Sequence, residues 1–502
     1  MPSPAAHRLP YCAASYRRQR AAHAIGVAMR ASRTLRMLVP PIAATCAACA
    51  TPRMNLPLEH PVTHGQDGYY IGSSEADRTN RDETFVVLAA AGGGTRAAAF
   101  TYGALQAMQQ TEIGAGKTLL DDLDLITSVS GGSFAAAYYG LFPEEFFSRF
   151  PEDFLYRSMG RGLALRMASP RNLLRLMSPA FSRSDLAAEY YGEEFFRNRT
   201  FADMPRTRPW IAINATDLSS GAQFPFTQNQ FDVLCSDLDS VPLGRAVAAS
   251  AAVPVAFPPL TLRNYPKSTC GYTTPAWAKQ ASSGSDVAPR MRALANNWLS
   301  YENAGHRPYL HVGDGALSDN TGLRGFLDFV DMGDALDVSA RIERGEIRTI
   351  VVVVVDALAN VEFAADRHLH PPGAAAVLEA SLVNQLQSYS AEMVQRLHTW
   401  FEQWDEAARR YDALRVRCEA LGRRAPQCQR DMAIAEPPRP RLYVIQVRLE
   451  AIPDDGVRKK LGDPKTVIQL KRSEGKLLVE WAGWLMRSSP DYRKLLADRK
   501  IR

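Results

Sequence analysis

The fold is decided by TFVVLAAAGGGTRAAAFTYGALQAMQQ (residues 84–110) and LLDDLDLITSVSGGSFAAAYYGL (residues 119–141). Each segment starts with an apolar run of strand length, breaks at small residues and continues with the composition of a helix. In the first, the strand runs from Phe85 to Ala91, Gly92–Gly94 end it, and a helix is expected from Ala97 to Gln110. The segments therefore predict two successive strand–turn–helix units.

The second unit places a serine at a sharp turn. Its strand covers Leu123–Ile126, and Ser130 is followed by Gly131 and Gly132 before the helix begins. A serine at a helix N-terminus lies among free backbone N–H groups, and the two glycines permit a close approach of other groups. This is the geometry of a nucleophile elbow, with Ser128 where G-x-S-x-G has its first glycine.

A nucleophilic serine also needs a base and donors for the oxyanion. The backbone N–H groups of Gly92, Gly93 and Gly94 are candidate donors, and Arg96 adds a positive charge. A candidate base is Asp314, which with Gly315 follows a predicted strand at Tyr309–Val312.

In this order, GGGTR, SVSGG and DGA resemble the motifs of the patatin-like phospholipases, over about residues 84–322. The resemblance implies a Ser130–Asp314 dyad without histidine, and an oxyanion region at Gly92, Gly93, Gly94 and Arg96. Gly131, Gly132 and Gly315 support the motifs. The implied reaction is hydrolysis of fatty-acyl esters of (lyso)phospholipids or related lipids through an acyl-serine, without a metal or other cofactor. Ser128 and Ala97, where a glycine is common, depart from the family pattern.

Strands that alternate with helices predict an α/β fold. We expect a doubly wound, mainly parallel sheet in a three-layer patatin-like sandwich, with the site at the carboxyl ends of the strands. The predicted catalytic domain covers 84–357, with a helical insertion at about 143–205 and an irregular surface insertion at 263–308. A C-terminal helical extension with one strand follows at 358–502, packed on the core.

We expect an export signal or leader over 1–48, with Met29 or Met37 as the alternative start, followed by a polar leader over 49–83. A basic segment precedes an apolar one, and small residues before Cys49 resemble a lipoprotein cleavage site. We therefore expect an exported protein of the cell envelope, with Cys49 as a possible lipidation site facing the periplasm. The alternative is a disordered basic tail. No other segment has the apolar length of a membrane span.

The net charge of +6 arises from residues 1–53, which carry eight arginines and no Asp, Glu or Lys. The remaining chain is close to neutral, which argues against nucleic acid as a partner and leaves a lipid substrate and a membrane surface as the expected ones. Between Phe154 and Ser184 there are six arginines and no acid. This stretch is either a lid or interfacial segment that meets anionic lipid, or a set of packed helices with a solvated basic face.

Alternatives remain open at this stage. Ser130 and Asp314 could form a triad with His368 or His370, as in an α/β-hydrolase. The chain could also be an inactive lipid-binding scaffold, or bind a nucleotide through its glycine turn. Among the cysteines, Cys418 and Cys428 could form a disulfide, whereas four buried free thiols are the other interpretation of Cys235, Cys270 and this pair. No Cys/His spacing predicts a zinc site.

Overall fold

The computed structural model describes residues 54–62, 68–72, 83–114, 116–332, 337–358, 369–421, 435–463 and 469–499. These residues fall within one compact unit, Ala50–Arg502. Cys49 and the predicted leader over 1–48 lie outside the described residues, as do His368 and Cys428.

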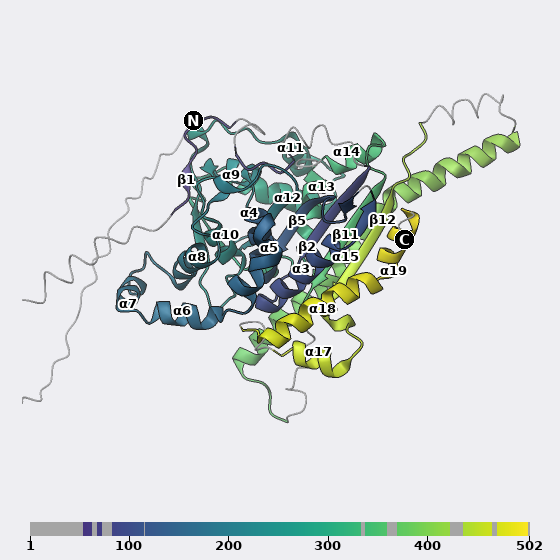
Figure 1. Cartoon of the computed structure of the whole chain (residues 1–502). Coiled ribbons are helices and arrows are strands. Elements are labelled where there is room, and N and C mark those ends of the chain that lie inside the picture. Colours follow the sequence, from purple (N-terminus) through teal and green to yellow (C-terminus); the bar gives the residue numbers. More distant parts are fainter. Residues whose placement is uncertain are drawn as a thin grey trace, which may run out of the picture. The chain divides into compact units, whose positions relative to one another are not determined.

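The centre of the fold is an eight-stranded sheet with the order β12-β11-β2-β5-β6-β10-β9, in which β7 pairs with β6 (Figure 1). The strands β12, β11, β2, β5 and β6 are parallel to their neighbours, whereas β10, β9 and β7 run antiparallel. The mainly parallel sheet predicted from the sequence is therefore confirmed. Its strands are β2 Thr84–Ala90, β5 Leu123–Val129, β6 Trp210–Asp217, β7 Ala222–Pro225, β9 Leu260–Arg263, β10 Tyr309–Gly313, β11 Thr349–Asp356 and β12 Arg441–Arg448.

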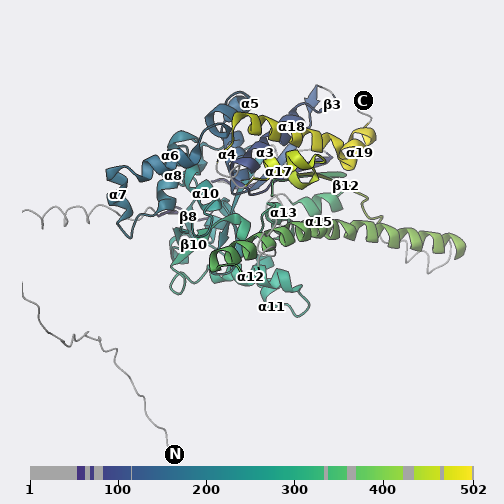
Figure 2. The same ribbon diagram turned by 90° about the horizontal axis from the view of Figure 1, so that it is seen from below.

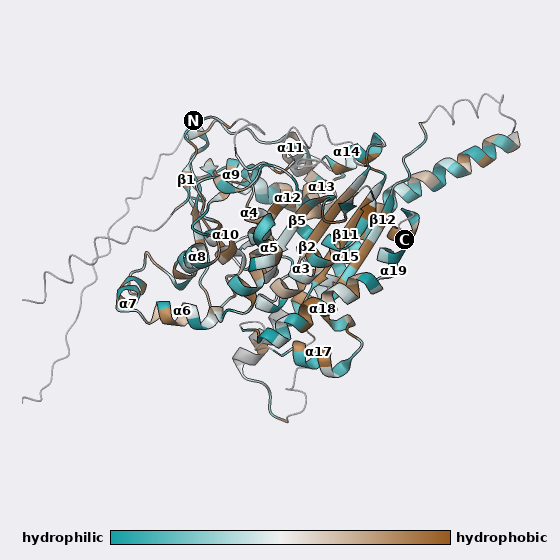
Figure 3. Cartoon of the chain, in the orientation of Figure 1, coloured by the Kyte–Doolittle hydropathy of each residue, from teal (hydrophilic) through white to brown (hydrophobic). Residues whose placement is uncertain are grey.

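Helices cover both faces of this sheet. Figure 2 shows α3 (Gly94–Gln109), α4 (Gly131–Leu141) and α18 (Arg472–Ser488) on one face, and α13 (Leu323–Met332) with α15 (Ala374–Leu421) on the other. Because both faces are covered, the middle strands are apolar along their whole length, as the hydropathy colouring of β2 and β11 illustrates (Figure 3). The result is the three-layer sandwich that the sequence predicts.

The C-terminal segment contributes to this sheet directly. All eight residues of β12 pair with β11 in parallel register, from Thr349 opposite Arg441 to Asp356 opposite Arg448. Helix α18 packs against α3, and α19 (Pro490–Asp498) packs against β12. The predicted C-terminal strand is thus an edge strand of the main sheet.

The predicted insertion at 143–205 is helical. It contains α5 (Pro143–Phe150), a π-helical turn (Pro151–Leu155), α6 (Met159–Met167), α7 (Pro170–Leu176) and α8 (Arg183–Glu194). Phe146, Phe150 and Phe154 are buried and stack in series, with ring centroids 5.0 and 5.2 Å apart. This aromatic column fixes the start of the insertion on the core.

One local expectation is wrong. Residues 263–308 are not irregular, because they form α11 (Ala276–Ser283) and α12 (Pro289–Ser300), joined by a contact between Trp277 and Trp298. The high Pro and Ser content hides these helices in the sequence, although a proline is well tolerated in a first helical turn, as in α12. A short hairpin of β3 (Glu112–Gly114) and β4 (Lys117–Thr118) follows α3.

Cys235 and Cys270 form a disulfide, so the free-thiol interpretation is wrong for these two residues. Cys235 directly precedes β8 (Ser236–Asp237), which pairs with the N-terminal β1 (Leu56–Pro57). The Cys418–Cys428 pair stays a prediction, because Cys428 is not described. Among the described helices, none is both long and apolar enough to cross a bilayer.

Candidate active site

Ser130 lies at the junction of β5 and α4 with φ 50° and ψ −117°, a backbone conformation that a side chain disfavours. Such strain is typical of a nucleophile elbow, where the turn presents the hydroxyl above the sheet. The residue is 7% exposed. Its Oγ donates to Oδ2 of Asp314 at 3.2 Å, so the structure brings the two predicted dyad residues together.

Asp314 reaches this place from a strand of opposite direction. β10 runs antiparallel to β6, and Gly313 pairs with Thr216, beyond the point where Asn214 pairs with Val129 of β5. The expectation that the site lies at the carboxyl ends of parallel strands therefore holds for Ser130 and is incomplete for Asp314. Asp314 directly follows β10, which pairs antiparallel with the last residues of β6, beyond the end of β5.

Two contacts hold Asp314 in position. Oγ1 of Thr216 donates to the carbonyl oxygen of Asp314 at 2.8 Å, and Oδ1 of Asp314 accepts the N–H of Ala316 at 2.9 Å. Gly315 lies directly against the backbone carbonyl of Asn214, where a Cβ would clash. The predicted DGA motif thus has a steric reason for its glycine.

The buried environment tunes the Asp314 carboxyl as a base. Removal from water raises its pKa from 3.8 to about 7, against the opposing hydrogen bonds from Ala316 N–H and Ser130 Oγ. A carboxylate with a pKa near neutrality can accept the Ser130 proton and return it in a later step. The dyad is therefore chemically suited to acyl transfer.

The glycine turn after β2 packs directly on the elbow. A Cβ on Gly131 would lie 2.6 Å from the nitrogen of Gly94, and one on Gly132 would lie 2.6 Å from the carbonyl oxygen of Ala90. Gly93 and Gly94 have φ values of 138° and 63°, which glycine adopts readily. Both turns must therefore be built of glycine to bring their backbones together.

The predicted oxyanion group needs correction at Gly92. Its N–H donates to the carbonyl oxygen of Asn320 at 2.9 Å, so this donor is already occupied. Among the described residues, no acceptor is found for the N–H groups of Gly93, Gly94 and Gly131. These three groups are the better candidates for holding an oxyanion, since a residue after the nucleophile commonly supplies one donor.

The predicted oxyanion role of Arg96 stays a prediction. The side chain is buried, but its Nη1 contacts the carbonyl oxygen of Leu461 at 3.4 Å, in the C-terminal segment. Burial lowers the pKa of Arg96 to about 10. The negative charge of Asp356, at the end of β11, opposes this effect but is the smaller of the two. The contact with Leu461 ties α3 to the C-terminal segment.

A chain of hydroxyl groups behind Ser130 was missed by the sequence analysis. Ser250, at the end of α10 (Leu243–Ser250), accepts the backbone N–H of Ser130 at 2.8 Å and donates to the Asn214 carbonyl at 2.6 Å. Ser133 lies 3.0 Å from Ser250 Oγ and donates to Ser128 Oγ at 3.1 Å. Ser128, the departure from the motif, therefore takes part in a buried network that supports the elbow.

Asn320 was missed as well. It is buried, and its Oδ1 lies where a Cβ on Gly92 would be, 2.5 Å away. Its Nδ2 has no hydrogen-bond partner within the described part of the chain. The only signal in the sequence is that Asn320 lies six residues after Asp314. In a loop, this spacing does not predict where the side chain points.

The other candidate residues lie away from the dyad. Asp217 is buried and pairs with Arg307, and it accepts a hydrogen bond from Tyr301 at 2.9 Å, so its contacts are structural. His311 contacts Thr261 at 3.1 Å, and His370 is exposed. No described histidine hydrogen-bonds to either dyad residue, and no group of three or more potential metal ligands occurs in the described ranges. A triad through His368 lies outside the described residues.

Comparison with known proteins gives one sequence match. Residues 88–327 match the family model described as patatin-like phospholipase. No curated protein matches the chain significantly. Among solved structures, human GIVD cytosolic phospholipase A2 has a TM-score of 0.37 and 13% sequence identity, covering 85% of this chain and 64% of its own. The chain thus spans less than two thirds of that structure, and the family assignment depends on the sequence match.

Proposed function

We propose that this chain, whose residues 88–327 match the patatin-like phospholipase family model, hydrolyses fatty-acyl esters of phospholipids or lysophospholipids. The observation that carries the proposal is the hydrogen bond from Ser130 Oγ to Asp314 Oδ2, at a strained strand–helix turn. A histidine is not required between the two residues, because the buried carboxyl has a pKa near neutrality.

The proposed reaction has two steps. Asp314 takes the Ser130 proton as Oγ attacks the acyl carbonyl, and the N–H groups of Gly93, Gly94 and Gly131 hold the oxyanion. Collapse of the tetrahedral intermediate transfers that proton to the leaving alcohol and leaves an acyl-serine. Water then attacks the acyl-serine and gives a proton to Asp314, and the proton returns to Ser130 as the fatty acid leaves.

The competing proposal is a lipid-binding scaffold without activity. A fluorophosphonate probe distinguishes the two, because it reacts only with an activated serine. We expect an adduct on Ser130 by mass spectrometry, lost in Ser130→Ala and strongly slowed in Asp314→Asn. Ser148→Ala, at an exposed position on α5, is the matched control and should label like the wild type. A folded wild-type protein without label on Ser130 would favour the scaffold.

Substrate class follows from a second assay. Purified protein is incubated with phospholipids labelled on either acyl chain, with lysophospholipid and with a neutral acylglycerol, and the released fatty acid is measured. Release from at least one phospholipid substrate, abolished by Ser130→Ala, is the expected result. Release from acylglycerol alone would replace the phospholipid with a neutral lipid.

We further propose export to the cell envelope with a lipid on Cys49. The Cys235–Cys270 disulfide supports an oxidising compartment. Metabolic labelling with a fatty acid, followed by fractionation, tests this proposal: the label should be lost in Cys49→Ala. Labelling that is equal in both proteins, or a soluble unlabelled wild type, would contradict it.

A further inference from the structure

Exposed apolar side chains gather on one region of the molecule. Among the large apolar residues that are exposed in the described chain, six come from α6, α7 and the loop after α10: Leu165, Leu173, Leu174, Met177, Val253 and Val255. Met177 is 81% exposed and Val255 is 79% exposed. We call α6, α7 and the loop 253–257 the docking surface. Large apolar groups gathered in this way mark a contact site.

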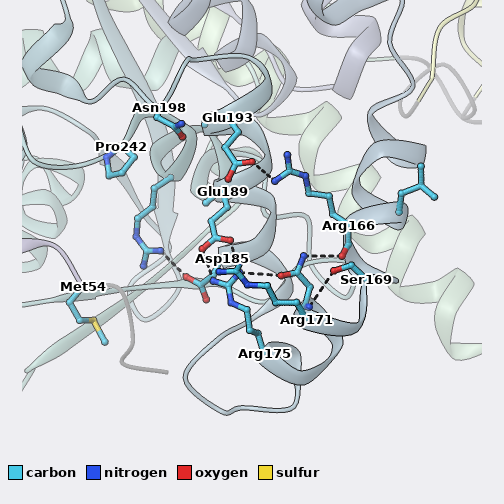
Figure 4. Close-up of a pocket in the computed structure, with 15 residues that line it drawn as sticks. Met54, Arg166, Ser169, Arg171, Arg175, Asp185, Glu189, Glu193, Asn198 and Pro242 are labelled. Carbon is cyan, nitrogen blue, oxygen red and sulfur yellow. Dashed lines mark hydrogen bonds and ion pairs between the residues drawn. The ribbon is translucent and has the colours of Figure 1, made fainter. Parts of the chain in front are cut away.

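The arginines around this surface differ in whether they have an acidic partner. Arg166 and Arg175 pair with Glu193 and Glu189 of α8, and these pairs line a cavity of about 970 Å³ between the hairpin α6–α7 and α8 (Figure 4). The glutamates therefore neutralise these two arginines.

Two other arginines of the hairpin have no acidic partner. Arg161 and Arg171 are exposed, and neither forms an ion pair with any described residue, although Arg171 also lines the cavity. Arg183, at the start of α8, is also exposed and donates to the carbonyl oxygen of Val255 at 3.2 Å. From Ser158 to Ser182 the chain has no Asp or Glu. The docking surface thus combines exposed leucine and methionine with uncompensated positive charge.

The loop 253–257 connects this surface to the dyad. It follows α10, whose Ser250 accepts the N–H of Ser130, and the carbonyl oxygen of Ala252 accepts the N–H of Asp314 at 3.2 Å. Val255 has a φ of 71°, a rare conformation for a β-branched residue. A strained residue that holds an apolar side chain in solvent suggests a functional constraint rather than a packing one.

From these observations, we propose that the docking surface binds the face of an anionic lipid bilayer and brings the dyad to it. Apolar side chains on a helix pair enter the acyl boundary, and Arg161, Arg171 and Arg183 meet the lipid phosphates. The positive charge of this surface favours an anionic bilayer over a second copy of the chain. In a symmetric dimer through this surface, the same arginines would face one another. The role given to the docking surface, bringing the dyad to its substrate, rests on the proposed function. Bilayer binding itself does not, because it can be measured without hydrolysis.

The test uses the full chain with Cys49→Ala and Ser130→Ala, so that neither a bound lipid nor hydrolysis affects binding. Co-sedimentation with vesicles of phosphatidylcholine alone and with one third phosphatidylglycerol gives the partition coefficients. We expect stronger binding to the anionic vesicles, reduced about tenfold or more by Leu174→Ser with Met177→Ser. Arg161→Gln with Arg171→Gln should reduce it similarly, and only on anionic vesicles. Equal binding to both vesicle types would overturn the anionic assignment.

A matched control is available on α15. Val416→Ser with Arg417→Gln changes an exposed apolar and an exposed basic residue there, and should leave vesicle binding unchanged. Equal losses in this variant and in the docking variants would overturn the proposal. So would docking variants that alter the oligomeric state by light scattering and leave vesicle binding intact, which would identify a second copy as the occupant.

A parallel assay with Ser130 intact separates this inference from the proposed function. The docking variants should hydrolyse a soluble short-chain ester at the wild-type rate and vesicle phospholipid more slowly. If no ester is hydrolysed while vesicle binding depends on the docking surface, the proposed function fails and the docking inference stands. If both substrates are hydrolysed normally by the docking variants, the docking inference fails.

Discussion

Replacement of Asp314 by Asn should make the protein more stable, by an amount that grows with pH. Burial raises the pKa of this carboxyl from 3.8 to about 7, so the folded state holds the proton more tightly than the unfolded chain. The stability of the wild type therefore falls as pH rises from about 4 to about 7, and levels off above. Asn keeps the shape, accepts the Ala316 N–H and has no charge to bury.

The size of the effect follows from the shift. A difference of about three pKa units corresponds to about 4 kcal/mol of unfavourable ionisation, of which about 3 kcal/mol falls between pH 5 and pH 8. Burial also raises the pKa values of Asp124 and Asp356 to about 6, and their contributions cancel when variant and wild type are compared at the same pH. The gain in unfolding free energy of Asp314→Asn should therefore increase by about 3 kcal/mol over this range.

Urea unfolding followed by tryptophan fluorescence, at four pH values from 5 to 8, measures this gain. Asp286→Asn removes one carboxyl from an exposed position and is the matched control for the loss of a carboxylate. An Asp314→Asn difference that is constant across the range would refute the reasoning. In that case the carboxyl ionises in the folded protein as it does in water, and it would be a poor base at neutral pH.

Three further outcomes are expected. The kcat/KM for a soluble ester should rise with pH through an apparent pKa of about 7, because Asp314 acts only when ionised; a profile that is flat from pH 5 to 8 would contradict this. Ser250→Ala should lower kcat about 10- to 100-fold with little change in KM, because it removes the acceptor that fixes the Ser130 N–H; an unchanged kcat would remove Ser250 from the site. Replacement of Cys235 and Cys270 by Ala should cost about 3–4 kcal/mol of stability, measured by urea unfolding, since the bridge closes a loop of 35 residues; a loss below about 1 kcal/mol would contradict the chain-entropy account.

The sequence was most informative where short-range pattern and chemistry agree. The apolar runs that became β2, β5 and β11 have the length and composition of strands buried on both faces, and the glycine and serine turns follow from the conformations they require. Ser130 and Asp314 lie 184 residues apart, and their 3.2 Å contact was expected from the order of three motifs, without knowledge of the strand direction.

The sequence does not predict which distant residues contact the glycine turn, Arg96 and the elbow. Gly92 was predicted as an oxyanion donor because of its neighbours, but Asn320 occupies its N–H from more than two hundred residues away. Arg96 was assigned to the site by its position in the motif, whereas a partner in the C-terminal segment, Leu461, determines where its guanidinium lies. Ser250 belongs to an alanine-rich stretch without polar spacing, so its contact with Ser130 follows only from the packing of α10.

The position of β2 in the sheet has a consequence for folding. Thr84 begins β2, and its partner on one side is Thr349 at the start of β11, so this pairing closes a loop of more than 260 residues. Contacts of such sequence separation form slowly, and during synthesis they wait until the later strand has left the ribosome. The glycine turn after β2 depends also on Asn320, and α3 is tied to Leu461. A nascent chain therefore cannot complete the candidate site until β11 has been made.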